Sequence, residues 1–269
     1  MTRTATTIDS RAMGWTTTSD GLEIYYEDSR AAGPALVFQS GFMGIHDIWK
    51  HQVAELGAAF RCITHDNRGH GLSSSPADEA MYSTQKNADD LRAVLDATGL
   101  AEPFVLVTHS MGSANAVAFA LQHPELVRGI LMLGGAHISG EAALKRGGHP
   151  DMFASRNLSP VASFQFFTNF GLDPAIAMEA AKWPRHVFRN QTAALLGFSP
   201  GDLGRLNMRI LVVHGTDDVI TPVEVPQDSV RQLPNAALKM LAGVNHFPQT
   251  ENPSAVNAII REFEQGLPR

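Results

Sequence analysis

Short runs of apolar residues recur along the chain, and each is only four to seven residues long. Because these runs are mostly apolar and do not alternate with polar residues, they indicate strands buried on both faces, as in a parallel sheet. Residues 14–28 predict two further strands in a β-hairpin, since Ser19-Asp20-Gly21 is a strong turn signal. The six apolar runs are 35–38, 60–64, 103–108, 127–133, 209–214 and 236–241.

Segments with helical spacing lie between these runs. Apolar positions repeat every three or four residues over 88–98, and Gly99 follows as a helix-ending residue. The alanine-rich segment 111–122 predicts a second helix. We expect residues 221–224 (Thr-Pro-Val-Glu) to form a capping box, and Asn252-Pro253 to open the last helix. Strands that alternate with helices predict a doubly wound α/β fold with a mostly parallel, eight-stranded sheet.

The segment from 137 to 205 breaks the alternation, because it has no strand-like run and is rich in aromatic residues. We therefore divide the chain into a core (1–136 and 206–269) and a small helical lid (137–205) inserted between two core strands. The aromatic side chains of the lid either pack against each other or line a substrate pocket, and both can hold.

Composition and charge exclude several classes of protein. The chain has 21 basic and 27 acidic residues, and the net charge of −6 argues against a nucleic-acid partner and does not favour acidic membranes. The lone Cys62 excludes an intrachain disulfide and a cysteine-based zinc site. Residues 1–9 lack the apolar run of a secretory signal, and no stretch is long enough to span a membrane. We expect a cytoplasmic protein.

Residues 107–114 (Val-Thr-His-Ser-Met-Gly-Ser-Ala) carry the chemistry, because an apolar strand runs into Ser110 and an alanine-rich helix follows it. This context is typical of a nucleophile elbow, in which Gly112 and Ala114 allow the strand and helix to approach. The turn lifts the Ser110 hydroxyl out of the sheet and places the Met111 amide at a helix N-terminus, where it can bind an oxyanion. The alternative is a serine that caps a buried helix.

On these residues the chain resembles the α/β-hydrolase fold family, over essentially its whole length outside the lid. Thr108 stands where the family's Gly-x-Ser-x-Gly pattern has its first glycine. Residues 66–73 (Asp-Asn-Arg-Gly-His-Gly-Leu-Ser) are similar to the family's D-x-R-G-x-G-x-S loop. We interpret this loop as structural and expect Asp66 and Arg68 to pair within it. Within the family, the chain is most similar to enol-lactonases, esterases and cofactor-free haloperoxidases.

The resemblance implies a catalytic acid and then a histidine, in that order after the serine. Residues 215–222 are similar to the family's G-x-x-D-x-x-x-P loop, which makes Asp218 the acid and Asp217 the alternative. His246 matches the histidine of the family's x-H-F-P ending. We treat the other histidines as structural, and no His-x-His or HExxH spacing suggests a metal.

The resemblance also implies a second oxyanion donor in the loop 38–44. Relatives usually carry His-Gly there, whereas this chain has Ser40-Gly41. Aligning the glycine makes the backbone amide of Phe42 the donor, and a backbone donor tolerates the side-chain change. We therefore expect Phe42 and Met111 to bind the substrate's carbonyl oxygen.

These residues predict acyl transfer to water through a Ser110–His246–Asp218 triad, with no cofactor and no metal. We expect the substrate to be a small carboxylic ester or lactone, uncharged or weakly polar. By resemblance, Ser110 excludes epoxide hydrolases and haloalkane dehalogenases, which use an aspartate nucleophile.

Three alternatives stay open: a C–C bond hydrolase acting on a diketone, a slow-turnover ligand receptor and a cofactor-free dioxygenase. The C–C hydrolase needs an additional polar group in the lid. The lid residues that could supply one are Arg156, Asn157, Arg185, His186, Arg189 and Asn190. Whether the chain forms a homodimer also stays open.

Overall fold

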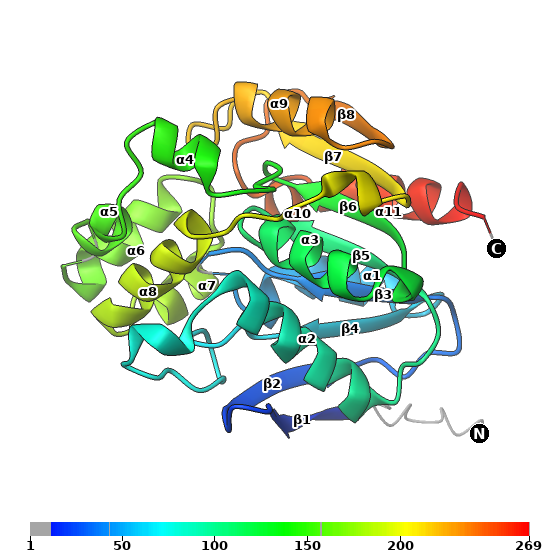
Figure 1. Cartoon of the computed structure of the whole chain (residues 1–269), viewed down its shortest axis with the longest axis horizontal. Coiled ribbons are helices and arrows are strands. Elements are labelled where there is room, and N and C mark those ends of the chain that lie inside the picture. The colour runs from blue at the N-terminus through cyan, green and yellow to red at the C-terminus, as the bar shows by residue number, and fades with distance from the viewer. Residues whose placement is uncertain (1–11, 43, 157, 269) are drawn as a thin grey trace, which may run out of the picture.

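The computed structural model describes residues 12–42, 44–156 and 158–268, which form one eight-stranded sheet with helices on both faces (Figure 1). The strand order is β1-β2-β4-β3-β5-β6-β7-β8. β2 runs antiparallel to both β1 and β4, and the other neighbours are parallel. The strands are β1 (Ala12–Thr17), β2 (Glu23–Asp28), β3 (Ala35–Gln39), β4 (Arg61–His65), β5 (Phe104–His109), β6 (Val127–Leu133), β7 (Arg209–Gly215) and β8 (Ala236–Leu241). The predicted fold class is confirmed.

Helices cover the sheet in two layers, and α2 and α3 lie in front of it in Figure 1. The core helices are α1 (Lys50–Leu56), α2 (Thr84–Thr98), α3 (Gly112–Gln122), α9 (Glu224–Gln232), α10 (Pro248–Glu251) and α11 (Pro253–Gln265). Short 3₁₀ helices are η1 (His46–Trp49), η2 (Glu79–Met81), η3 (Pro124–Leu126) and η4 (Leu203–Arg205). No helix in the described ranges is long and apolar enough to cross a membrane.

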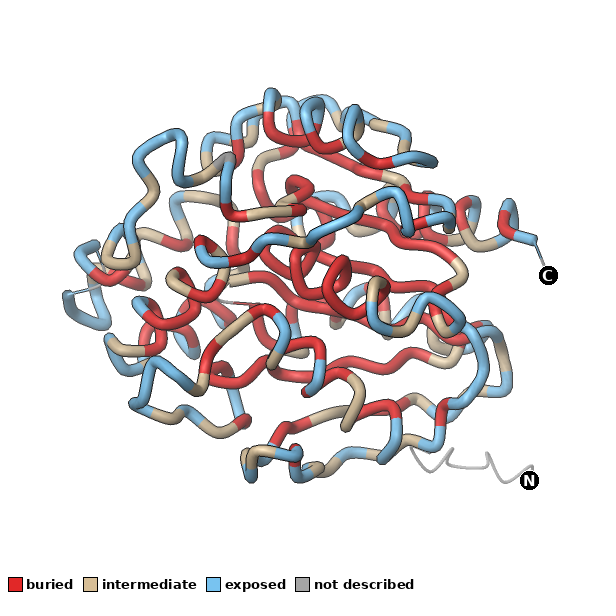
Figure 2. The backbone as a smooth tube through the Cα atoms, in the orientation of Figure 1, coloured by how far each residue is buried: buried red, intermediate tan, exposed pale blue. Residues whose placement is uncertain are grey.

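The apolar runs are continuous because each strand supplies two hydrophobic cores. Leu106 and Ile130 belong to the core under α2 and α3, whereas Val105 and Leu131 belong to the core under α1 and α11. Side chains of a strand point alternately to opposite faces, so every position of a central strand is apolar when both faces are covered. Figure 2 shows the resulting band of buried residues along the central strands.

The segment between β6 and β7 contains helices joined by loops, and no strand occurs in the part of it that the structure describes. Its helices are α4 (Glu141–Lys145), α5 (Asp151–Ala154), α6 (Pro160–Thr168), α7 (Pro174–Ala180) and α8 (Arg185–Leu196). They gather at one end of the sheet, away from both termini (Figure 1). Phe167 and Phe188 are buried in the core beneath α1, so part of the aromatic content of this segment serves packing. We call α4–α8 the helical insertion.

Two of the three helix boundaries that the sequence predicts are confirmed by the structure. Gly99 follows α2 in the left-handed conformation, with φ 67°, and the Asn252 side chain accepts a hydrogen bond from the Ala255 amide at the start of α11. The prediction of a capping box at 221–224 is wrong, because α9 begins only at Glu224. Thr221 is engaged elsewhere: its amide donates to Asp218 Oδ1, and its hydroxyl lies 3.2 Å from His137 Nε2.

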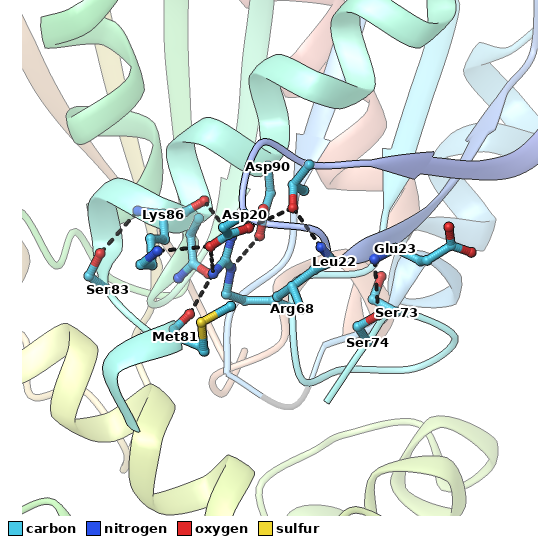
Figure 3. A network of polar contacts seen from close by, with 12 residues as sticks. Asp20, Leu22, Glu23, Arg68, Ser73, Ser74, Met81, Ser83, Lys86 and Asp90 are labelled. Atoms are coloured by element: carbon cyan, nitrogen blue, oxygen red, sulfur yellow. Dashed lines mark hydrogen bonds and ion pairs between the residues drawn. The ribbon is translucent and has the colours of Figure 1, made fainter. Parts of the chain in front are cut away.

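The predicted Asp66–Arg68 pair is also wrong. The Arg68 guanidinium is 1% exposed and donates to both carboxylate oxygens of Asp90, at 2.7 and 2.6 Å. It also donates to Asp20, at 3.0 Å, in the turn between β1 and β2 (Figure 3). Asp66 instead accepts the amides of His46 and Leu72, at 2.7 and 2.9 Å. Arg68 therefore ties the hairpin to α2, and Asp66 holds its own loop closed.

We expect Arg68→Met to destabilise the protein by about 3–5 kcal/mol, because the buried Asp90 carboxylate would lose its partner. Arg92→Met on the same helix is the matched control. It breaks an exposed pair with Asp96, which is worth under about 1 kcal/mol. Denaturant unfolding measures both losses. Equal losses in the two variants would show that the Arg68 pair does not anchor the hairpin.

Candidate active site

Ser110 lies in the sharp turn between β5 and α3, and its φ of 50° is in the left-handed region. A non-glycine residue held there stores backbone strain, which is common at functional sites. The Ser110 amide donates to the Leu133 carbonyl oxygen, at 2.9 Å, which holds the turn against β6. Gly112 is required next to it, because a Cβ there would lie 2.4 Å from the Gln39 carbonyl oxygen. Thr108, in place of the family's glycine, is buried with its hydroxyl 3.2 Å from Ser113 Oγ.

His246 follows β8 and points its Nε2 at Ser110 Oγ, at 3.1 Å. Its backbone is fixed from two sides. His109 Nε2 lies 2.9 Å from the His246 carbonyl oxygen, and the His246 amide donates to Asn245 Oδ1, at 2.9 Å. Burial lowers the pKa of His109 to about 3, so the ring stays neutral and can donate from Nε2. His109 thus has a positioning role, and the interpretation of this histidine as structural agrees with its contacts.

Asp218 lies in the loop after β7, with Oδ2 2.8 Å from His246 Nδ1. The carboxylate has no solvent exposure, and Oδ1 accepts the amides of Ile220 and Thr221, at 2.9 and 2.8 Å. Burial alone would raise the pKa of Asp218, but its hydrogen bonds with His246 and Thr221 lower it below its ordinary value. Asp217 is exposed and accepts the Thr216 hydroxyl. The structure therefore brings Asp218, and not Asp217, to His246.

Sequence reasoning missed two histidines near this group. His214 Nδ1 lies 3.6 Å from Asp218 Oδ2 and is buried, and burial lowers the pKa of its ring. His137 lines the cavity beside Ser110 and contacts Thr221. The positions of these histidines at strand ends are a weak signal for such contacts, since strand ends also hold many residues that only pack.

The loop 39–42 reaches the Ser110 turn closely. A Cβ on Gly41 would lie 2.5 Å from the His109 carbonyl oxygen, so only glycine fits there. The neighbouring Ser40 hydroxyl accepts from Trp49 Nε1 and donates to the Ile45 carbonyl oxygen, at 2.9 and 3.2 Å. These bonds support the loop without the histidine that relatives carry.

Phe42 and Met111 both border the cavity next to Ser110. Neither backbone amide donates to another of the residues that the structure describes. Met111 also stands at the N-cap of α3, where the helix dipole favours negative charge. The two amides are thus free to bind an anionic oxygen.

A cavity of about 380 Å³ opens beside Ser110 between the core and the helical insertion. The Phe153 ring packs on Phe42, with the ring centroids 4.7 Å apart. The insertion residues on its wall include Arg146, Met152, Phe153, Arg156, Leu195 and Leu196. A larger hollow of about 780 Å³ lies over residues 31–35 and 99–103, at the amino ends of β3 and β5, and contains none of the candidate residues.

Of the polar insertion residues singled out from the sequence, Arg156 alone lines this cavity among those that the structure describes. Arg189 pairs with Glu79 and Asp151, and the Asn190 side chain donates to the Ala77 carbonyl oxygen. Arg185 and His186 lie outside the cavity wall, and Asn157 lies outside the described residues.

The arrangement can take a proton from a serine hydroxyl, hold the resulting imidazolium against a buried carboxylate, and bind a negatively charged oxygen with backbone amides. No group of three or more His, Cys, Asp or Glu side chains able to hold a metal ion occurs within the described residues.

Comparison with known proteins identifies the fold. The pattern of the family described as "alpha/beta hydrolase fold" matches residues 34–175. The solved structure of Est816, described as an N-acyl homoserine lactone degrading enzyme, is 30% identical and has a TM-score of 0.78. The match covers 93% of this chain and all of that one. Esterases and an enol-lactonase are among the other structural neighbours. The predicted resemblance to this family is confirmed.

The curated relatives include proteins named for other hydrolytic reactions. The 2-hydroxymuconate semialdehyde hydrolase of Pseudomonas sp. (strain CF600) is 27% identical, over 90% of each chain. Epoxide hydrolase 1 of Caenorhabditis elegans is 25% identical over 86% of this chain. The chain spans between 55% and 64% of the length of this and other animal relatives it matches.

We expect Gly112→Ala to destabilise the protein by about 1–3 kcal/mol, because the new methyl group would press on backbone oxygens that cannot move aside cheaply. Helix propensity alone predicts the opposite sign, a gain of up to about 1 kcal/mol. Gly14→Ala is the control, since a Cβ there has its nearest neighbour at 3.8 Å, and it should stay within about 0.5 kcal/mol. Thermal or urea unfolding decides the sign, and a stabilised Gly112→Ala would refute the close contact.

Proposed function

The chain belongs to the α/β-hydrolase fold family, and on that premise we propose that it hydrolyses a small-molecule carboxylic ester or lactone with Ser110 as nucleophile. The observation that carries this proposal is the continuous chain from Ser110 Oγ to His246 Nε2 and from His246 Nδ1 to Asp218 Oδ2, with distances of 3.1 and 2.8 Å. A serine hydroxyl becomes a nucleophile when a neighbouring base takes its proton and a third group orients that base.

The first half of the reaction is acylation. Ser110 Oγ attacks the carbonyl carbon of the substrate, and His246 Nε2 takes the hydroxyl proton. The Asp218 carboxylate holds the proton on His246 Nδ1 and stabilises the imidazolium. The carbonyl oxygen becomes an oxyanion and accepts hydrogen bonds from the amides of Phe42 and Met111. When the tetrahedral intermediate collapses, His246 gives its proton to the departing alkoxide.

The second half releases the acid. His246, now neutral, takes a proton from water, and the resulting hydroxide attacks the acyl–Ser110 ester. The same two amides bind the second oxyanion, and His246 returns its proton to Ser110 Oγ. All proton transfers run through one ring, so the reaction requires no cofactor.

Support for an ester or lactone substrate comes from the relatives. Est816 is named for lactone degradation and matches the chain over almost its whole length. A second candidate function is C–C bond hydrolysis, because the 2-hydroxymuconate semialdehyde hydrolase matches over 90% of each chain. Such a reaction leaves a carbanion and needs an additional polar group, and Arg156 in the cavity wall can supply one.

We expect a fluorophosphonate probe to add once to the wild-type protein and not at all to Ser110→Ala, as read by intact mass. The reagent forms a stable adduct only where a serine is activated by a base. Ser254→Ala, on the exposed side of α11, is the control and should be labelled like wild type. A folded wild type that takes up no probe would contradict the proposal and favour a receptor or dioxygenase.

We expect Asp218→Asn to lower kcat by about 10³–10⁴, because an amide cannot hold the His246 proton in the productive tautomer. Asp217→Asn is the matched control, one residue away and exposed, and should stay within about threefold of wild type. Kinetics on an activated ester and a melting curve are measured for both variants. The reverse order of losses would make Asp217 the acid.

A further inference from the structure

Two arginine residues line the cavity beside Ser110, and both are exposed. Arg146 follows α4 and Arg156 follows α5, so both come from the helical insertion. The remaining insertion residues on the wall are largely apolar and include Met152, Phe153 and Leu195. The residues that line the cavity thus combine apolar side chains with two arginines.

Neither guanidinium forms an ion pair with any other residue in the described parts of the chain. The nearby carboxylates already have partners. Glu141 pairs with Lys145 at 2.6 Å, beside Arg146 in the sequence. Asp151 lies 3.2 Å from Arg189. Arg156 itself sits 5.9 Å from the centre of the Phe166 ring, an arrangement that orients a guanidinium without neutralising it.

The described cavity wall contains no Asp or Glu side chain. Its other titratable group is His137, and burial lowers the pKa of that ring to about 4, so it is neutral at pH 7. The Asp218 carboxylate contacts the Nδ1 side of the His246 ring, away from Ser110. Its oxygens accept hydrogen bonds from His246 and from two backbone amides. The described cavity wall therefore holds two arginines and no acidic residue, although the chain as a whole carries a net charge of −6.

We propose that the substrate carries a free carboxylate, which Arg146 and Arg156 bind while its ester or lactone carbonyl lies against Ser110. This inference rests on the proposed function, and it replaces the expectation of an uncharged or weakly polar substrate. A planar guanidinium matches a carboxylate with two parallel N–H···O bonds, and this makes arginine well suited to the task. The apolar wall between the arginines and Ser110 then contacts the short carbon chain that joins the two groups.

The test compares two esters that differ in one charge: mono-p-nitrophenyl glutarate and its methyl ester. We expect wild type to have a kcat/KM about tenfold higher for the free acid than for the methyl ester. The double variant Arg146→Met/Arg156→Met should lose this preference. Arg185→Met is the control, because it removes one positive charge from the insertion at an exposed position outside the cavity wall. It should keep the preference of wild type.

A second measurement does not need turnover. Glutarate should slow fluorophosphonate labelling of Ser110 in wild type and in Arg185→Met, but not in the double variant. Dimethyl glutarate should slow it less.

A wild type without preference for the acid, or a preference that survives in the double variant, would overturn the carboxylate site and leave the serine hydrolase proposal standing. If Ser110 takes up no probe and neither ester is hydrolysed, the proposed function itself fails.

Discussion

The site depends on direct backbone contact at the turn after β5. The loop that carries Phe42 and the turn that carries Ser110 touch through Gly41 and Gly112, where a Cβ would lie 2.5 and 2.4 Å from carbonyl oxygens of the facing segment. Ser110, between these two glycines in space, has a left-handed conformation with φ 50°, and the surrounding sheet has to stabilise that strain. The Phe42 and Met111 amides come together beside the serine for the same reason. Replacing either glycine would separate the elements that define the site.

Local sequence patterns were sufficient to predict the strands of the sheet. A strand covered on both faces is apolar at every position, and the hairpin turn is determined by two adjacent residues, so neither needs long-range information. The predictions that failed concern polar groups with more than one available partner. Asp66 was expected to bind Arg68, but Asp90 and Asp20 reach Arg68 from 22 and 48 residues away. Thr221 was expected to cap α9, but it bonds to Asp218 and His137 instead. Sequence distance carries no information about such competition.

The candidate site also has one part that the sequence predicts and another that it does not. Ser110 could be located from its strand–turn–helix context, and Asp218 and His246 from the motifs of the family that the chain resembles. All three follow strands at the carboxyl edge of a parallel sheet, where loops meet. The wall of the cavity could not be predicted. Much of it comes from the segment around α4 and α5, which have five and four residues, too few for a hydrophobic period to say which side chains face inward. Arg146 was not singled out for this reason, and Arg156 was one of six equal candidates.

On the proposal of a carboxylate substrate, net charge is a poor guide to the ligand, and electrostatic screening gives the physical reason. At physiological ionic strength the field of an exposed charge decays over about 8 Å, a distance shorter than the molecule. A ligand that enters the cavity therefore responds to the groups on its wall and not to the sum of −6 over the chain. Arg146 and Arg156 line the cavity, and no Asp or Glu is among its described wall residues. Hydrogen bonds in the core thus orient the candidate reactive groups, whereas the arginines that we propose to bind the substrate belong to the helical insertion, so substitutions there need not disturb the turn at Ser110.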